Sequence, residues 1–116
     1  MTRFNPEWLN RPRKRASPEA HLVRQIITYL RIKGFRAGKI KTHGVWDSKS
    51  RAYRADPYAW VGVPDILCFT PALVFIECKA GHNTQSSEQQ SFQQLCTTAG
   101  IPYILAYSLE DVQKIM

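Results

Sequence analysis

The 116-residue sequence is poor in cysteine and has no long apolar run. Its three cysteines, Cys68, Cys78 and Cys96, are odd in number and lack Cys-x-x-Cys spacing, so we expect reduced, mostly buried thiols. Residues 1–16 contain no apolar core of a signal peptide, and no segment could span a membrane. We therefore expect a cytoplasmic protein with no membrane partner.

Acidic residues are scarce in the first half of the chain. Residues 1–56 hold 14 Lys and Arg against 4 Asp and Glu, whereas residues 57–116 hold 2 against 5. A basic block of this kind is typical of proteins whose partner carries repeating negative charge, because binding phosphates releases condensed counterions. Nucleic acid is the favoured partner, and a membrane surface or a merely soluble basic surface are the alternatives.

The chain is long enough for one domain with its own core. Residues 1–16 contain two prolines and the basic run Arg11–Arg15, a composition that favours a flexible arm. We therefore expect a basic N-terminal arm at residues 1–16 and a single folded domain at residues 17–116.

Apolar periodicity and capping residues predict an α/β domain with the order α-β-β-β-α-β-α. We expect residues 43–58 to form a mobile excursion without helix or strand. The residues of the second helix that should face the core are Phe92, Leu95, Cys96 and Ala99. Those of the last helix are Val112 and Ile115. The predicted elements are a helix at 17–34, strands at 35–42, 65–70 and 73–79, a helix from Ser86 or Ser87 to Ala99, a strand at 101–107 and a short helix after Ser108.

The hairpin formed by the second and third predicted strands brings two carboxylates together. A three-residue loop at 70–72 sets Asp65 opposite Glu77, whereas a two-residue loop at 71–72 sets Asp65 opposite Cys78, with Glu77 diagonal to it. In either register the two carboxylates are neighbours, and like charges there are destabilising unless something positive lies between them. A divalent cation is the natural occupant.

Two further charged residues belong to this predicted site. Lys79 lies two residues beyond Glu77, so the period of a strand places both side chains on one face. Glu19 shares the apolar stripe of the first helix, where an uncompensated acid would be costly to bury. Oxygen ligands without suitably spaced His or Cys select Mg²⁺ or Mn²⁺ over Zn²⁺. Such an ion next to a lysine indicates phosphodiester hydrolysis.

Each residue also has a structural interpretation. Asp65 could be a simple turn acid, and Glu77 with Lys79 could be a solvated ion pair of little worth. Glu19, in the first turn of a helix, could interact only with the helix dipole. Gln89 could do no more than cap the second helix together with Ser86.

The motif V-P-D-I, followed after an eleven-residue gap by E-C-K, resembles the P-D…(D/E)-x-K motif of the restriction-endonuclease-like nucleases. The acid on the first helix, G-V-P-D, I-E-C-K-A-G and the following S-x-x-Q together resemble the virus-type replication and repair nuclease domain (VRR-NUC). The resemblance runs from Ser17 to the end of the chain. It implies a mixed central β-sheet flanked by helices, and a host-cytoplasmic location if the protein is viral.

The resemblance also implies a role for each matching residue. Lys79 would act on the attacking water, and Gln89 would point into the site from its helix. The implied catalytic residues are Glu19, Asp65, Glu77, Lys79 and Gln89, and the implied metal ligands are Glu19, Asp65, Glu77 and the backbone carbonyl of Cys78.

Basic and aromatic residues complete the predicted nucleic-acid surface. Aromatic residues interleaved with cations, among them Tyr58 and Trp60, could stack on unpaired bases, although Trp60 could equally pack in the core. The basic residues expected to bind phosphates are Arg13, Lys14, Arg15, Lys39, Lys41, Lys49, Arg51 and Arg54.

These features predict a Mg²⁺- or Mn²⁺-dependent deoxyribonuclease that selects branched or otherwise structured DNA and needs no small-molecule cofactor. A homodimer would suit a Holliday-junction resolvase, because two sites related by a twofold axis match a four-way junction. A flap- or nick-specific repair nuclease and a non-catalytic nucleic-acid-binding protein are the alternatives.

Overall fold

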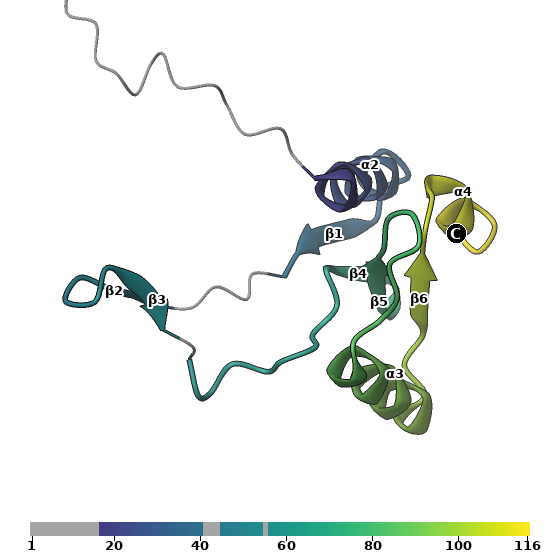
Figure 1. Ribbon diagram of the computed structural model, residues 1–116. Helices are drawn as coiled ribbons and strands as arrows, with labels where there is room; N and C mark the ends of the chain where they lie inside the picture. The colour runs from purple at the N-terminus through teal and green to yellow at the C-terminus, as the bar shows by residue number, and fades with distance from the viewer. Residues whose placement is uncertain (1–16, 41–44, 55) are drawn as a thin grey trace, which may run out of the picture.

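The computed structural model describes residues 17–40, 45–54 and 56–116 (Figure 1). The predicted arm at residues 1–16 lies outside the described residues. The elements are α2 (Pro18–Ile32), β1 (Arg36–Lys39), β2 (Val45–Asp47), β3 (Ala52–Arg54), β4 (Ile66–Thr70), β5 (Ala72–Cys78), α3 (Ser87–Ala99), β6 (Tyr103–Ala106) and α4 (Leu109–Gln113).

A four-stranded mixed sheet with the order β1-β4-β5-β6 forms the centre of the domain. The β1–β4 and β4–β5 pairs are antiparallel, and the β5–β6 pair is parallel. The predicted mixed α/β sheet is therefore confirmed, and the predicted order holds once β2 and β3 are set aside.

The β4–β5 hairpin has the register of the three-residue loop. Phe69 pairs with Leu73 and Thr70 with Ala72, which leaves Pro71 at the tip. The alternative two-residue loop is wrong. Since β5 lies between β4 and β6, it is a central strand, so Glu77 does not lie on an exposed edge.

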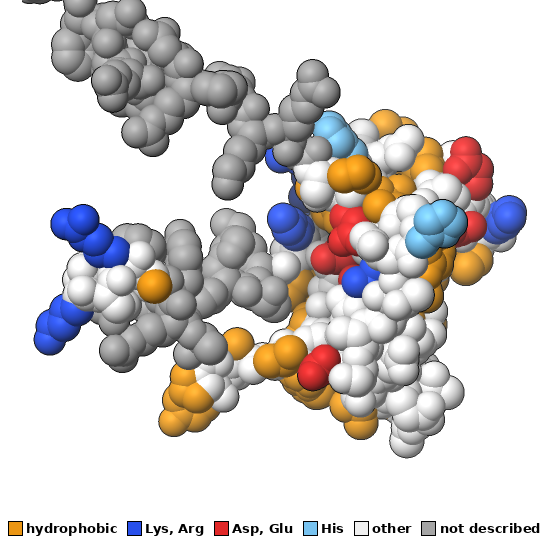
Figure 2. Space-filling model, in the orientation of Figure 1, with side chains coloured by type: hydrophobic (Ala, Val, Ile, Leu, Met, Phe, Trp, Pro, Cys, Tyr) orange, Lys and Arg blue, Asp and Glu red, His pale blue; other side chains and the backbone are white. Residues whose placement is uncertain are grey.

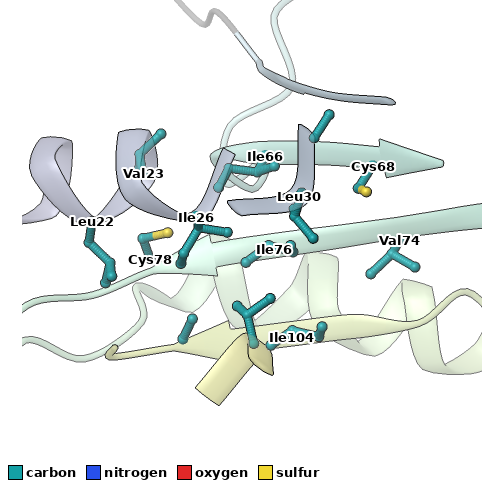
Figure 3. Packing of buried hydrophobic residues seen from close by; sticks show 13 residues of the cluster. Leu22, Val23, Ile26, Leu30, Ile66, Cys68, Val74, Ile76, Cys78 and Ile104 are labelled. Carbon is teal, nitrogen blue, oxygen red and sulfur yellow. The ribbon is translucent and has the colours of Figure 1, made fainter. Parts of the chain in front are cut away.

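Helix α2 covers one face of this sheet. Ser17 caps it by accepting a hydrogen bond from the Ala20 N–H, and Pro18 begins it. Its buried residues are Leu22, Val23, Ile26 and Leu30. Figure 3 shows Ile26 and Leu30 directed at Ile66 and Ile76, which are fully buried. Each such aliphatic side chain contributes about 1.5–3 kcal/mol to stability on burial, so this layer supplies much of the driving force for folding.

Helix α3 lies on the opposite face, where Phe92 makes an edge-to-face contact with Phe75 of β5. Its predicted cap Ser86 is confirmed, and the left-handed Gly100 ends it. The predicted burial of Leu95 is wrong, since this side chain is 51% exposed. Because α3 packs against the edge strand β6 and reaches β5 through Phe92, the sheet covers only the narrow stripe that contains Phe92 and Cys96.

At the ends of α3 and α4, two residues that were predicted to be buried are exposed. Ala99, on the last turn of α3, is exposed. In α4 Val112 is buried as predicted, but Ile115 lies beyond the helix and is 67% exposed. Ala99 is the last residue of α3 and Ile115 follows the end of α4, so in both places the apolar pattern outlasts the buried face of the helix.

The expectation that residues 43–58 lack strands is wrong. Strands β2 and β3 form an antiparallel hairpin, with Val45 paired to Arg54 and Asp47 to Ala52. Arg51 turns the chain with a positive φ of 52°. Figure 1 shows this hairpin away from the central sheet, and among the described elements it contacts only itself. Local pairing of β-forming residues suffices to form it, so no amphipathic alternation toward a core is needed.

Two other expectations concern the chain as a whole. Cys68, Cys78 and Cys96 are free and buried, as predicted. In the described residues, no helix has both the length and the apolar character that crossing a membrane requires.

Candidate active site

The strand alternation of β5 separates the core from the candidate site. Ile76 and Cys78 belong to the hydrophobic core under α2, so Glu77 points to the face of α3. Asp65 lies directly before β4, and its Oδ2 accepts a hydrogen bond from the Cys78 N–H at 2.9 Å. The open end of the hairpin thus holds both carboxylates, as the three-residue loop predicts.

Glu77 is the only buried charged residue among those described, with 2% of its surface exposed. Its Oε1 accepts a hydrogen bond from Gln89 Nε2 at 3.1 Å and lies 3.8 Å from Lys79 Nζ. Its Oε2 is buried, and no group among the described residues donates a hydrogen bond to it. Burying an oxygen without a hydrogen-bond donor costs free energy, so the site fits a further cation or hydrogen-bond donor.

The pKa of Glu77 is raised to about 8, first by burial and then by the negative charge of Asp65 and a hydrogen bond with it. Lys79 opposes this rise in pKa, and Glu19 adds weakly to it. When Asp65 and Glu77 are both ionised, each can only accept hydrogen bonds, so Asp65 cannot donate one to Glu77 Oε2. A proton or a metal cation shared with Asp65 would satisfy it, and the two are therefore expected to compete.

Glu77 should make the protein less stable as pH rises. In the folded protein its pKa is about 8, against 4.5 ordinarily. Between these values only the folded state keeps the proton, so the stabilisation is complete below about pH 4.5 and is lost as pH rises through about 8. The free energy of unfolding should therefore fall by at least roughly 2 kcal/mol over this window.

Urea unfolding in EDTA from about pH 5 to about pH 9 measures this effect. Glu77→Gln is the matched control, because its amide does not titrate. The stability of wild type relative to this variant should decline with pH, and a constant difference would contradict the assignment.

Glu19 lies beside the pair, not within it. Its Oε1 accepts hydrogen bonds from Asn83 Nδ2 at 2.8 Å and from the Ala80 N–H at 3.4 Å. Both donors belong to the turn that follows β5, and this turn and the start of α2 line a hollow of about 610 Å³. Asn83 was not among the residues predicted from the sequence. A polar side chain four residues after Lys79 was the available signal, but nothing in the sequence pairs it with α2.

Gln89 serves two functions at once. Its Oε1 accepts a hydrogen bond from the Ser86 N–H in the capping box, and its Nε2 reaches Glu77. The loop before α3 is fixed by a hydrogen bond from Gln85 Nε2 to the Tyr103 hydroxyl at 3.0 Å. Burial raises the pKa of Tyr103 to about 12, so the hydroxyl stays protonated. The structural and functional interpretations of Gln89 are therefore compatible.

Gly62 is a second residue that the sequence analysis missed. It has a φ of +90°, and a Cβ built there would lie 2.5 Å from the backbone carbon and oxygen of Glu88 and 2.9 Å from the Gln89 nitrogen. Glycine thus allows the chain leading to Asp65 to touch the first turn of α3. The glycine of G-V-P-D was the available signal in the sequence, but only the packing shows that this glycine contacts α3.

The predicted phosphate-binding residues are spread over the basic half of the chain. Lys39, Lys49 and Arg51 are exposed. Figure 2 shows Lys and Arg side chains at the β2–β3 hairpin. On the same face of the molecule, acidic side chains lie next to a basic one between α2 and α3. The predicted residues Arg13, Lys14, Arg15 and Lys41 and the side chain of Arg54 lie outside what the structure describes.

The described residues contain no group of three or more His, Cys, Asp or Glu side chains that could hold a metal ion. The structure brings Asp65 and Glu77 together, whereas the Glu19 carboxylate is bound by Asn83. The unpaired Glu77 Oε2 and the two hard carboxylates fit a cation such as Mg²⁺. The three-carboxylate set and the Cys78 carbonyl remain predictions.

Fold and site together define an α/β domain with two carboxylates, a lysine and a glutamine at the open end of a central hairpin. A solved structure described as a VRR_NUC domain is similar to this chain, with a TM-score of 0.62 and 16% sequence identity. The match covers 86% of this chain and 95% of that one. The fold is therefore VRR-NUC-like. Neither a protein-family model nor a curated protein matches the sequence.

Proposed function

We propose that this protein is a Mg²⁺- or Mn²⁺-dependent deoxyribonuclease with its active site at Asp65, Glu77, Lys79 and Gln89. One observation carries the proposal: Glu77 is buried next to Asp65, and no described residue donates a hydrogen bond to its Oε2. Without a cation, only a proton shared with Asp65 could satisfy this oxygen. The VRR_NUC description of a similar fold supports the same activity.

In this proposal Asp65 and Glu77 would hold the cation, with the Cys78 carbonyl and, once turned from Asn83, Glu19. The bound ion would supply Lewis-acid polarisation of a phosphoryl oxygen and a lowered water pKa. Lys79, 3.8 Å from Glu77 Oε1, orients the attacking water and offsets developing negative charge. Gln89 keeps the Glu77 carboxylate in one orientation through its hydrogen bond. No residue forms a covalent intermediate.

DNA is the proposed substrate because its phosphates match the basic half of the chain. Residues 17–116 would be the nuclease domain, and residues 1–16 would add sequence-independent affinity. DNA shape would select the substrate, with a four-way junction cut by a homodimer and a flap or nicked duplex cut by a repair nuclease as the two candidates.

Cleavage assays test this proposal directly. Labelled junction, flap, nicked and linear duplexes are incubated with Mg²⁺, Mn²⁺ or EDTA, and we expect metal-dependent cuts in at least one structured substrate. Calorimetric titration of Mn²⁺ provides a readout separate from activity, and light scattering reports whether the protein is a dimer. Absence of cleavage on every substrate with either metal would overturn the enzymatic proposal.

A non-catalytic nucleic-acid-binding protein is the second candidate. It is favoured by the Glu19–Asn83 hydrogen bond, which directs the third predicted ligand away from the Asp65–Glu77 pair. In that case DNA binding would be identical in EDTA and Mg²⁺, calorimetry would detect no ion, and no product would form.

Basic residues of the β2–β3 hairpin should strengthen DNA binding in a salt-dependent way. Replacing Lys49 by Ala and Arg51 by Gly removes two charges, and glycine suits the positive φ at position 51. If both side chains contact phosphates, the slope of log K against log salt should fall by about 1.8 for duplex DNA. Fluorescence anisotropy measures the slope, and Lys114→Ala, at the end of α4, is the control. An unchanged slope would remove the hairpin from the binding surface.

A further inference from the structure

Exposed aromatic side chains lie in the segment that leads to Asp65. Tyr58 is 95% exposed, Trp60 is 59% exposed and Val61 is 70% exposed. Figure 2 shows hydrophobic side chains gathered where this segment runs between β3 and β4. Core packing, the alternative for Trp60, accounts for only part of this side chain, because more than half of its surface faces solvent.

The Trp60 ring is nevertheless held in place. It makes an edge contact with Phe92 of α3 at a centroid distance of 5.2 Å, and Phe92 contacts Phe75 of β5 at 5.1 Å. Two hydrogen bonds fix the turn before it, since the Tyr58 N–H donates to Asp56 Oδ1 and the Ala59 N–H donates to Asp56 O. One side of the indole is thus anchored and the rest is offered to solvent.

The same segment is tied to the candidate active site. Gly62 touches the backbone of the first turn of α3, and Gln89 of that turn donates to Glu77. Asp65 follows Gly62 by three residues. The exposed rings and the carboxylate pair are therefore both connected to the first turns of α3, so a ligand on the rings would be held at a set position relative to the site.

We propose that Tyr58 and Trp60 form a stacking platform for an unpaired DNA base next to the active site. The substrate class is therefore duplex DNA with a single-stranded arm or flap, in preference to a fully paired four-way junction. This inference rests on the proposed nuclease function. In a continuous duplex both faces of a base are already stacked, whereas an unpaired base presents a free π-face to an aromatic ring.

Size and charge favour a base over a protein partner. Together Tyr58 and Trp60 can bury about 300–500 Å², less than the roughly 800 Å² that each partner buries in a standard protein interface. The hairpin with Lys49 and Arg51 precedes the segment directly and supplies cations for the backbone of the same strand.

Binding in EDTA tests the platform without cleavage. Anisotropy titrations compare a labelled forked duplex with a blunt duplex of the same sequence, using full-length protein. The variants are Tyr58→Ala, Trp60→Leu, which keeps apolar volume without a π-face, and Trp60→Phe, which keeps a ring. Phe69→Leu is the matched control, because Phe69 is 54% exposed but lies near the other end of β4.

Wild type should prefer the forked duplex, and Tyr58→Ala and Trp60→Leu should each weaken fork binding roughly five- to hundredfold. Trp60→Phe should retain most of the preference, and blunt-duplex affinity and the control should not change. Equal losses on both DNAs, or no loss on the fork, would overturn the platform. Fork preference without cleavage in Mg²⁺ would refute the nuclease alone, and cleavage without these losses would refute the platform alone.

Discussion

Replacing Lys79 by alanine should lower the rate of DNA cleavage by about two to four orders of magnitude without unfolding the protein. The Lys79 ammonium is the only cation within 4 Å of a described acidic side chain in the candidate site, at 3.8 Å from Glu77 Oε1. Without it, negative charge that develops on the phosphate loses its nearest compensation. Single-turnover cleavage of a flap or junction substrate in Mn²⁺ measures the effect.

The fold should survive because Lys79 lowers the pKa of Glu77, so its removal favours the protonated carboxyl, which needs no counter-ion. Circular dichroism and urea unfolding verify this. Asp65→Asn should reduce cleavage by a similar factor and, in addition, weaken Mn²⁺ binding in calorimetry.

Lys114→Ala and Glu110→Gln change exposed charges on or next to α4, outside the candidate site, and serve as controls. Cleavage by Lys79→Ala at more than about a tenth of the wild-type rate would assign catalysis elsewhere.

Replacing Gly62 by alanine should impair cleavage far more than the same change at Gly34. The two glycines have nearly equal φ angles, +90° and +92°, so the backbone cost of adding a Cβ is similar. At Gly34 the new Cβ meets nothing within 4 Å, whereas at Gly62 it would lie 2.5 Å from the backbone of Glu88. That backbone cannot rotate away as a side chain could, so α3 and the loop must separate.

Separation of α3 from the loop would draw Gln89 away from Glu77. A displacement of about 1 Å at a catalytic group can lower a rate roughly a hundredfold, and we expect a loss of this order for Gly62→Ala. Gly34→Ala should lose only about 1–2 kcal/mol of stability and cleave normally at temperatures where it is folded. Cleavage rates and urea midpoints of both variants measure the two effects. Equal activity of the two variants would show that the contact does not position the site.

Much of the site could be predicted from the sequence because it depends on local rules. The period of a strand places Glu77 and Lys79 on one face, and a hairpin loop sets the register that brings Asp65 to Glu77. The caps Ser17 and Ser86 define where α2 and α3 begin. Each of these depends on residues close together in the chain, so no knowledge of packing is needed.

The errors arose where packing decides. Leu95 has the correct helical spacing to be buried, but half of its surface stays exposed in the described part of the chain. The β2–β3 hairpin has no face against the core, so it produces none of the alternation by which a strand is recognised. In both cases the sequence pattern describes a surface, and only the fold determines whether another surface covers it.

The sequence by itself determined the elements of the central domain, its mixed α/β class and the meeting of Asp65 with Glu77, because backbone geometry and chain connectivity impose them. Only the tertiary structure decided that Asn83 binds Glu19, that Gln89 reaches Glu77 and that Gly62 touches α3. These contacts join residues brought together by helix packing across the sheet. Such distances depend on the volumes of all intervening side chains, which no local pattern in the sequence contains.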